Sequence, residues 1–417
     1  FHSYLLGPTG SGKTTAMLHL IMSDIEAGKG VFVLDPKSDL VRDVLARVPE
    51  HRKKDVVVID PMSINPIGIN PFAAISEGAD PGVVADGLLA VFQKVSGSAW
   101  GKRMEDVLAC SLLTLARTKD ANLLMLAPLL TDAKFRQKIT EPLIKADPQG
   151  LGTFWKSYES MSDTVRRQVI APAMSRLRAF TLREPLRYIL GQSNPKFNLN
   201  DLFTENKIVL VALNKGKMGS EIAHLIGLTI ISQVWSLTLA RTDIPQEERD
   251  FVGIYIDEVH NFLSLPVGLE EALSQARALG VGFTLANQHL AQLTSELQSA
   301  IFANVANWIV FGLYSPEDCQ ALSKFAGSLS PEDFKYLPRY HVYFRCLFGG
   351  KPIWVSGKTL PPCPRTTNPD KLTILSESLY GSKRAEIDAD NMKRFNFEQD
   401  IAELLEKTEI GLEVEDE

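Results

Sequence analysis

The chain has 417 residues, enough for two domains or for one large domain with an insertion. Its composition, 45% hydrophobic and 23% charged, is that of an ordinary globular protein, and its formal net charge of −6 excludes a globally basic surface for nucleic acid. Its cysteines (Cys110, Cys319, Cys346 and Cys363) form no C-x-x-C pair, which argues against a zinc site or a disulfide framework.

A glycine-rich segment lies between an apolar run at residues 4–6 and a helical pattern at residues 15–21, and it fits the P-loop pattern G-x-x-x-x-G-K-[ST] at every fixed position. The residues concerned are Gly7, Pro8, Thr9, Gly10, Ser11, Gly12, Lys13, Thr14 and Thr15. In such a loop backbone N–H groups surround phosphate oxygens, Lys13 reaches the β- and γ-phosphates, and the Thr14 hydroxyl binds Mg²⁺. We therefore predict a nucleotide site for ATP and Mg²⁺; the alternative is a glycine-rich turn without a ligand.

Two buried strands are predicted next, at residues 31–35 and 56–60, because both segments are continuous apolar runs rich in β-branched residues. Ser38 is predicted to cap the helix between them. Strands that alternate with helices indicate an α/β fold, with a mostly parallel central sheet flanked by helices on both faces.

The alternation then stops, because residues 78–200 contain helical patterns, at 83–95, 104–117 and 165–180, and no convincing strand. Prolines within this region are expected to break its helices. They are Pro128, Pro142, Pro148 and Pro172. We interpret the region as an all-α domain inserted into the nucleotide-binding domain.

The sheet is predicted to resume with four strands, at residues 207–213, 252–257, 282–287 and 307–313. A hairpin at 340–347 and 353–355 is predicted to close its edge. The apolar segment 222–240 is long enough to span a membrane, but its polar side chains and its place between two predicted strands favour a buried helix.

A proline-rich break after Lys358 is the predicted end of the core. Beyond it we expect a short helix at 397–407 and an acidic run at 413–417, which is either a partly disordered terminus or a partner-docking element. The predicted division is therefore a nucleotide-binding domain in two parts (1–77 and 201–358), an all-α insertion (78–200) and a C-terminal extension (359–417). Because the chain begins almost on its first strand, we expect further sequence upstream.

Two carboxylates, Asp257 and Glu258, end the strand predicted at residues 252–257. In a P-loop ATPase such a pair holds Mg²⁺ through the aspartate and polarises the attacking water through the glutamate. The alternative is a surface Asp-Glu pair with no ligand. His260 completes a D-E-V-H sequence like that of some helicases, but no second arginine-rich motif follows, and we expect a locally hydrogen-bonded histidine.

Gln288 follows the next strand and is predicted to sense the γ-phosphate or to orient the water, because strand ends at the carboxyl edge of a parallel sheet meet at the ligand site. Arg277, between these two strands, is the first candidate for an arginine that enters the active site of a neighbouring subunit, and Arg176 and Arg178 are second candidates. Each is otherwise an ordinary solvated arginine.

The segment 214–219 is basic and glycine-rich, and it follows a predicted strand. Its Lys215 and Lys217 are candidates for contacts to DNA phosphates, without reading of base sequence. A mobile surface turn is an equally good interpretation.

Taken together, the motifs resemble those of the FtsK–HerA superfamily of ring-shaped DNA motors, and within it those of the TraG/TraD-like coupling ATPases of conjugation and type IV secretion. The resemblance covers residues 1–354. It rests on the P-loop G-P-T-G-S-G-K-T-T, V-L-D-P-K-S-D-L at 33–40, I-N-P-F at 69–72, Y-I-D-E-V-H at 255–260, S-Q-A-R at 274–277 and L-A-N-Q-H-L-A-Q-L at 285–293. The all-α insertion is also typical of these proteins.

The resemblance implies a RecA-like P-loop NTPase fold and a homohexameric, Mg-ATP-driven DNA translocase. It also implies type IV secretion channel and relaxosome proteins as partners. The chain would be a cytoplasmic domain, tethered to the inner face of the cell membrane by an N-terminal region that this chain does not contain. In the family, arginine fingers lie in the segment that includes Arg277.

Two other functions are compatible with the same residues. One is a soluble HerA-like DNA motor in DNA end-processing or phage defence. The other is an assembly scaffold that uses ATP only to lock a ring, and that recruits secretion substrates through the all-α domain or the acidic tail.

Overall fold

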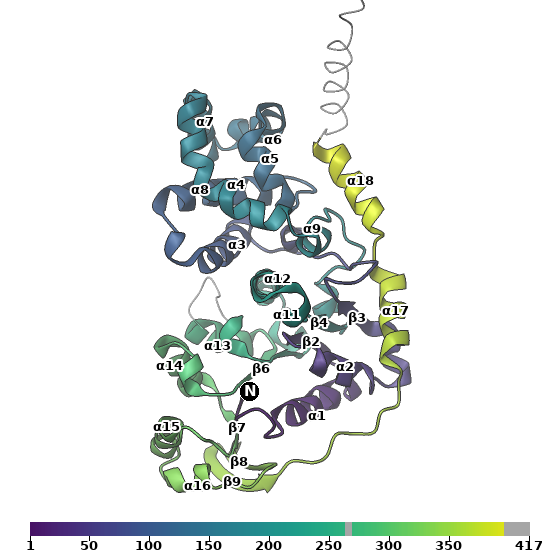
Figure 1. Ribbon diagram of the computed structural model, residues 1–417, viewed down its shortest axis with the longest axis vertical. Coiled ribbons are helices and arrows are strands. Elements are labelled where there is room, and N and C mark those ends of the chain that lie inside the picture. Colours follow the sequence, from purple (N-terminus) through teal and green to yellow (C-terminus); the bar gives the residue numbers. More distant parts are fainter. Residues whose placement is uncertain (263–268, 396–417) are drawn as a thin grey trace, which may run out of the picture.

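The computed structural model describes residues 1–262 and 269–395. Its centre is a nine-stranded sheet in the order β3-β4-β2-β5-β6-β1-β7-β8-β9 (Figure 1). The strands are β1 (Ser3–Leu6), β2 (Gly30–Asp35), β3 (Val56–Ile59), β4 (Ile208–Ala212), β5 (Val252–Ile256), β6 (Val281–Asn287), β7 (Asn307–Phe311), β8 (His341–Phe348) and β9 (Lys351–Lys358). Strands β1 to β7 pair in parallel, whereas β8 and β9 form an antiparallel hairpin beside β7. The predicted strands and the mostly parallel sheet are confirmed.

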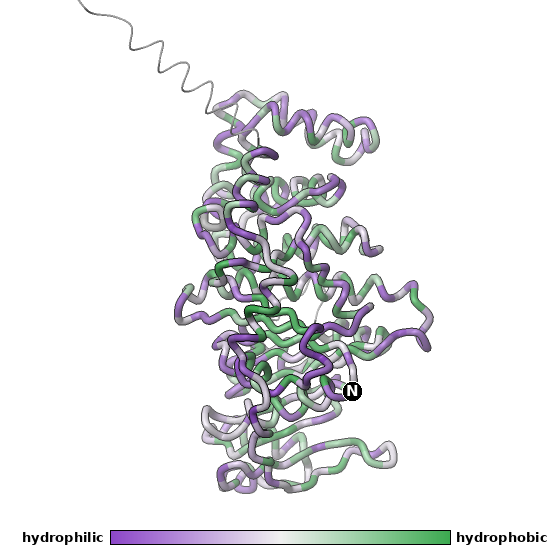
Figure 2. Tube along the Cα trace, turned by 90° about the vertical axis from the view of Figure 1, so that its right-hand side faces the viewer, coloured by the Kyte–Doolittle hydropathy of each residue, from purple (hydrophilic) through white to green (hydrophobic). Residues whose placement is uncertain are grey.

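Helices cover both faces of the sheet, because side chains alternate between its faces and both sets are apolar. On one face α1 (Lys13–Glu26) and α2 (Asp39–Leu45) pack on the strands and form one buried cluster with them. On the other face α12 (Ser220–Ala240), α13 (Leu269–Ala278) and α14 (Ser295–Asn304) share the larger buried cluster. Figure 2 shows the hydrophobic residues concentrated in the strands at the centre of the molecule.

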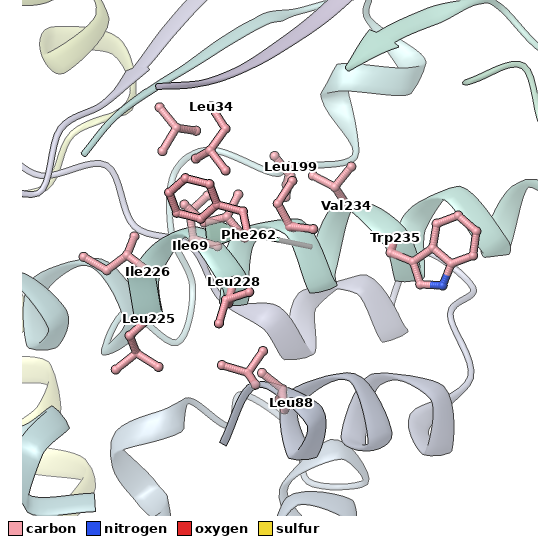
Figure 3. Packing of buried hydrophobic residues seen from close by; sticks show 14 of the residues in the cluster. Leu34, Ile69, Leu88, Leu199, Leu225, Ile226, Leu228, Val234, Trp235 and Phe262 are labelled. Atoms are coloured by element: carbon pink, nitrogen blue, oxygen red, sulfur yellow. The ribbon is translucent and has the colours of Figure 1, made fainter. Parts of the chain in front are cut away.

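Helix α12 is the central helix of this larger cluster. Figure 3 shows Phe262 and Leu34 on the side of α12 that faces the sheet and Leu88 of α3 on the opposite side. Residues Ser220–Asp243, which form α12 and the turn after it, are long and apolar enough to cross a membrane. However, 83% of the most apolar stretch of this segment is buried inside the protein. The prediction of a buried helix at residues 222–240 is confirmed.

The region between β3 and β4 is helical, as predicted, and lies beyond α12 from the sheet (Figure 1). Its helices are α3 (Pro81–Ser96), α4 (Lys102–Ala116), α5 (Leu126–Thr131), α6 (Ala133–Ala146), α7 (Leu151–Ser160), α8 (Asp163–Thr181) and α9 (Glu184–Leu190). The prediction that Pro142 and Pro172 break helices was wrong, because they lie inside α6 and α8. Both prolines are on exposed helix faces, where water can hydrogen-bond the carbonyls that they leave without a partner.

Two helices after the hairpin pack on the core: α17 (Pro369–Tyr380) and α18 (Arg384–Phe395). Helix α17 lies along the edge strand β3, where the Ser376 hydroxyl accepts a hydrogen bond of 2.8 Å from the Val58 N–H. Asn391 of α18 donates to the Gly191 carbonyl, which ties α18 to the end of α9. Neither helix was predicted, and the helix predicted at 397–407 and the acidic run lie outside the described residues. The remaining helices are α10 (Asp201–Thr204), α11 (Lys215–Met218), α15 (Pro316–Ala326) and α16 (Pro331–Lys335).

The loop that joins β2 to α2 differs from its prediction. Ser38 has a left-handed backbone, and its hydroxyl accepts from the Asn214 N–H (3.0 Å) rather than capping α2. The carboxylate of Asp35 takes the capping role, since it accepts from the N–H groups of Lys37 (2.8 Å) and Val41 (3.1 Å). A carboxylate near the N-terminus of a helix also interacts favourably with the helix dipole.

Candidate active site

The P-loop joins β1 to α1 and has the backbone that its glycines allow. Gly10 and Gly12 have positive φ angles of 80° and 113°. Gly7 has no room for a side chain, because a Cβ there would lie 2.6 Å from Cβ of Phe311. Helix α1 begins at Lys13 with no side chain capping its first N–H groups and no acidic residue in its first turn. A helix N-terminus of this kind is suited to binding phosphate.

Two polar side chains of this loop, those of Lys13 and Ser11, are hydrogen-bonded to no anion among the described residues. The Lys13 ammonium group donates to the loop's own carbonyls, at Gly7 and at Pro8 (3.1 Å). Burial lowers the pKa of Lys13, although the charge of nearby Asp257 opposes this. Ser11 Oγ is buried and has no hydrogen-bond partner within the described part of the chain. An anion in the loop would satisfy both side chains, so the residues fit a bound nucleotide phosphate.

Strand β6 lies between the P-loop strand β1 and the acidic strand β5, so that its last residues stand between the two motifs. The Gly7 N–H donates to the Asn287 carbonyl at 3.3 Å. The Gln288 amide joins the two motifs: its oxygen accepts from the Thr9 hydroxyl (3.2 Å) and its nitrogen donates to Glu258 Oε1 (3.3 Å). The structure therefore places Gln288 where the sequence predicts it, beside the P-loop.

Glu258 is the most heavily bonded side chain of the site. Its carboxylate is buried and pairs with Lys37 (2.6 Å, to Oε1) and with Lys215 (2.7 Å, to Oε2). Asn261 Nδ2 lies 3.5 Å from the same oxygen as Lys215. Burial by itself would raise the pKa of Glu258, but hydrogen bonds from Lys215 and Lys37 outweigh burial and lower the pKa to about 2. The group is therefore ionised.

Asp257 faces the same cavity as the P-loop helix. Its Oδ1 accepts from the Glu258 N–H at 2.9 Å, which leaves the other oxygen for a ligand. Loss of solvent around the carboxyl raises the pKa of Asp257, so a cation beside it would be favourable. Thr14 contributes a hydroxyl to the same cavity. Hard oxygen donors of this kind suit Mg²⁺, which a P-loop site normally holds with few protein ligands and phosphate oxygens.

These side chains surround a cavity of about 250 Å³ at the carboxyl edge of the sheet. It is lined by Thr9, Gly10, Gly12, Lys13, Thr14, Thr15, Lys37, Asp257, Glu258, Gln288, Arg339 and Tyr340. Pro8 and Ser11 line the adjoining cavity, beside Tyr314 and Leu337. The predicted phosphate, metal and water-activating residues thus converge on one place.

Other predicted residues lie away from this cavity. Lys217 is exposed on α11, beyond Lys215. Arg277 is exposed near the start of β6 and lies over the ring of Phe1, with 4.4 Å between guanidinium carbon and ring centroid. That position is at the amino edge of the sheet, a full strand length from the chain's own P-loop. Arg176 and Arg178 are on α8 in the insertion.

His260 is a locally bonded histidine, as predicted. Its Nδ1 donates to Asn287 Oδ1 at 2.7 Å, and the Asn287 amide donates in turn to the His289 carbonyl. This chain of bonds fixes the end of β6 beside the acidic motif.

Three residues that line the cavity were not predicted as site residues. For Lys37, which follows β2, the available signal was its place in the sequence D-P-K directly after a predicted strand. Arg339 and Tyr340 precede β8, and Arg339 Nε donates to the Gly10 carbonyl (3.1 Å) across 329 positions of sequence. No local sequence pattern marks Arg339 and Tyr340 as site residues. They reach the cavity only in the folded sheet, where β8 pairs with β7 and β7 pairs with the P-loop strand β1.

Fold and site together define a RecA-like P-loop NTPase. The sequence profile of the family described as type IV secretory system conjugative DNA transfer matches residues 1–333, and the chain belongs to this family. The predicted fold class and the predicted coupling-protein family are both confirmed. A comparison with curated protein sequences found no match.

Solved structures of the bacterial conjugative coupling protein TrwB are similar in fold. The unbound TrwBdeltaN70 structure has a TM-score of 0.60 at 15% identity, with 88% of each chain covered. The complex of TrwB with ADP and Mg²⁺ has a TM-score of 0.59 at 16% identity, with 88% of this chain and 86% of the other covered. A third TrwB structure holds the GTP analogue GDPNP, with a TM-score of 0.58 at 15% identity and 88% coverage of both chains.

Proposed function

We propose that the chain is the ATP-hydrolysing part of a conjugative coupling protein, a homohexameric motor that delivers DNA, with or without bound protein, to a type IV secretion channel. The observation that carries the proposal is the link from Thr9 of the P-loop through Gln288 to Glu258. This link connects the phosphate-binding loop to the water-activating carboxylate, so a change at the γ-phosphate reaches both. Family membership supplies the biological setting.

In the proposed reaction Lys13 holds the β- and γ-phosphate oxygens of ATP while the N–H groups of the P-loop surround them. Water attacks the γ-phosphorus, the bond to the bridging oxygen breaks, and ADP leaves with that oxygen. Glu258 orients the water and accepts its proton, and Gln288 positions the water and the Glu258 carboxylate. Mg²⁺, held by Thr14 and Asp257, would neutralise charge on the phosphate oxygens.

Arg277 is proposed to act on the site of a neighbouring subunit. It is exposed and lies at the amino edge of the sheet, away from its own P-loop, so any contact with a γ-phosphate is between subunits. Arg176 and Arg178 remain the second candidates. Head-to-tail contacts that place one edge of a subunit against the opposite edge of the next generate a ring when the rotation between subunits closes.

Lys215 and Lys217 are proposed to contact DNA phosphates, and relaxosome proteins and the channel are proposed partners. The chain is proposed to be a cytoplasmic domain that an N-terminal region tethers to the inner face of the membrane. ATP and Mg²⁺ are the proposed nucleotide and metal; TrwB, whose fold is similar, was solved with ADP and Mg²⁺ and with an ATP analogue.

The test is ATP-dependent displacement of streptavidin from end-biotinylated single- and double-stranded DNA. We expect displacement with ATP and none with a non-hydrolysable analogue or with Glu258→Gln. Displacement by neither DNA, under conditions in which ATP is hydrolysed, contradicts the motor. A Glu258→Gln protein that binds ATP and still supports conjugation in cells would instead favour the scaffold.

A further inference from the structure

Both oxygens of the Glu258 carboxylate are occupied by ammonium groups. Lys37 Nζ lies 2.6 Å from Oε1 and Lys215 Nζ lies 2.7 Å from Oε2. The two amides, of Gln288 and Asn261, add longer contacts to the same oxygens. Glu258 is only 5% exposed, so solvent competes weakly for these positions.

A water-activating carboxylate must accept a hydrogen bond from the attacking water. An ionised carboxylate offers about four acceptor positions, and two ammonium groups and two amides already occupy those of Glu258. The arrangement therefore holds the carboxylate in place but opposes the step in which it would act, and at least one donor has to leave before hydrolysis. An anion can draw away the charged donors, which are the two lysines.

The two lysines face different surroundings. Lys37 lines the nucleotide cavity together with Lys13, so the phosphates of ATP compete with Glu258 for its ammonium group. Lys215 is not among the residues that line this cavity, and its side chain is 37% exposed at the start of α11. An anion outside the nucleotide site can therefore reach Lys215 from solvent.

The segments that carry the two lysines are bonded to each other. The Lys215 N–H donates to the Pro36 carbonyl at 3.0 Å, and the Asn214 N–H donates to the Ser38 hydroxyl at 3.0 Å. Asn214 has a left-handed backbone with φ of 40°, which its side chain type tolerates. A displacement of Lys215 is therefore transmitted to the loop that carries Lys37.

We propose that Lys215 is a positioning residue that restrains Glu258 until a backbone phosphate of DNA takes its ammonium group. The inference rests on the proposed function and assigns to one lysine the coupling between DNA and hydrolysis. A phosphate is a suitable competitor because it replaces the carboxylate with another anion, so that the lysine stays paired. Lys217, exposed on the same short helix, adds positive charge where the DNA backbone would approach.

The test compares Lys215→Ala with Lys145→Ala in the full chain. Lys145 forms a 2.8 Å pair with Glu141 on α6, away from the site, and serves as a control of matched chemistry. We expect Lys215→Ala to raise kcat for ATP severalfold without DNA, at unchanged KM, and DNA to add less than twofold. Lys145→Ala keeps the low basal rate and the full stimulation, and Lys215→Arg restores the restraint.

A basal kcat of Lys215→Ala at or below that of the unaltered chain overturns the proposal. Lys215→Gln, which replaces the ammonium group with an uncharged amide on a side chain one bond shorter, gives the same comparison if the alanine protein fails to fold. The basal rates are measured without DNA, so they test the restraint even if DNA fails to stimulate the unaltered chain. Absence of that stimulation contradicts the release of Lys215 by DNA and the proposed motor, whereas the basal rates alone decide on the restraint.

Discussion

The two edges of the sheet use polar side chains in opposite ways. At the carboxyl edge Lys37, Lys215, Glu258 and Gln288 bond mainly to one another, so each has a partner that a ligand can replace. At the amino edge the Arg52 guanidinium donates to the backbone carbonyls of Ile25 and Asn206 as well as to Asp55. Backbone carbonyls are held by the fold, so a ligand replaces them less readily than it replaces a side chain. We therefore expect the carboxyl edge to perform the chemistry and Arg52 at the amino edge to stabilise the fold.

Arg277 is the residue that tests this division most severely, because it lies at the amino edge and is exposed. We expect Arg277→Ala to lower kcat by roughly 10³–10⁵-fold, the effect of removing an arginine finger, with ATP affinity unchanged. ATPase rates and binding of a fluorescent ATP analogue check this. Loss of ATP binding together with activity would make Arg277 a structural residue.

A mixture of two inactive proteins sharpens this prediction. In a ring, a boundary between an Arg277→Ala subunit and a Glu258→Gln subunit can combine an intact glutamate with an intact arginine, and random mixing gives about a quarter of such boundaries. We expect the mixture to regain activity. If it stays inactive, while Arg178→Ala mixed with Glu258→Gln recovers, the finger is Arg178.

Glu258→Gln tests the carboxyl edge. The amide cannot accept a proton from water, so we expect kcat to fall by roughly 10²–10⁴-fold while ATP still binds. The thermal unfolding temperature should change little, because the amide oxygen still accepts from one lysine. A large loss of stability with residual hydrolysis would mean that Glu258 is mainly a structural partner of the lysines.

Arg52→Met is the matching change at the amino edge. The Arg52 guanidinium is buried and donates to the carbonyls of Ile25 (2.8 Å) and Asn206 (2.6 Å), as well as to Asp55. Methionine leaves these carbonyls without a donor, so we expect a loss of about 3 kcal/mol in unfolding free energy. Urea unfolding measures the loss. At temperatures where the variant is folded, kcat should equal that of the unaltered chain. A lower kcat would contradict the assignment of chemistry to the carboxyl edge and of stability to the amino edge.

His2 gives the smallest effect, a dependence of stability on pH. Its Nε2 donates to the Leu273 carbonyl (2.6 Å) and its Nδ1 accepts from the Phe283 N–H (3.0 Å), so the folded chain holds a neutral ring. Burial lowers the pKa of His2 to about 4. The unfolded chain binds a proton near pH 6.5 and the folded chain only near pH 4, so stability is full above pH 6.5 and falls as the pH drops between these values.

For His2 we expect a loss of about 1 kcal/mol between pH 7.5 and pH 5.5. Unfolding by urea at the two pH values measures it. His2→Leu is the control, since it should be less stable at both values but with a smaller difference between them. Equal slopes for the two proteins would show that other groups cause the acid sensitivity.

Much of the fold could be predicted because its signals are local. Buried parallel strands appear as continuous apolar runs, and the P-loop and the Asp257–Glu258 pair are short motifs at strand ends. The start of α17 did carry a local signal, an Asn368 N-cap followed by Pro369. Helices α17 and α18 were nevertheless missed because contacts with residues distant in sequence hold them, such as the bond from Val58 to Ser376 and the burial of Leu372 and Phe395. For the same reason the sequence could not link Arg339 to Gly10, nor show that Lys215 pairs with Glu258.

Hydrolysis is proposed to take place at boundaries between subunits and to respond to DNA. The ATPase rate per chain, measured over a range of protein concentrations, with and without DNA, and with Glu258→Gln as the blank, tests this directly. We predict a rate that rises steeply with protein concentration and rises again when DNA is added. A rate per chain that is independent of concentration and of DNA would contradict the proposal.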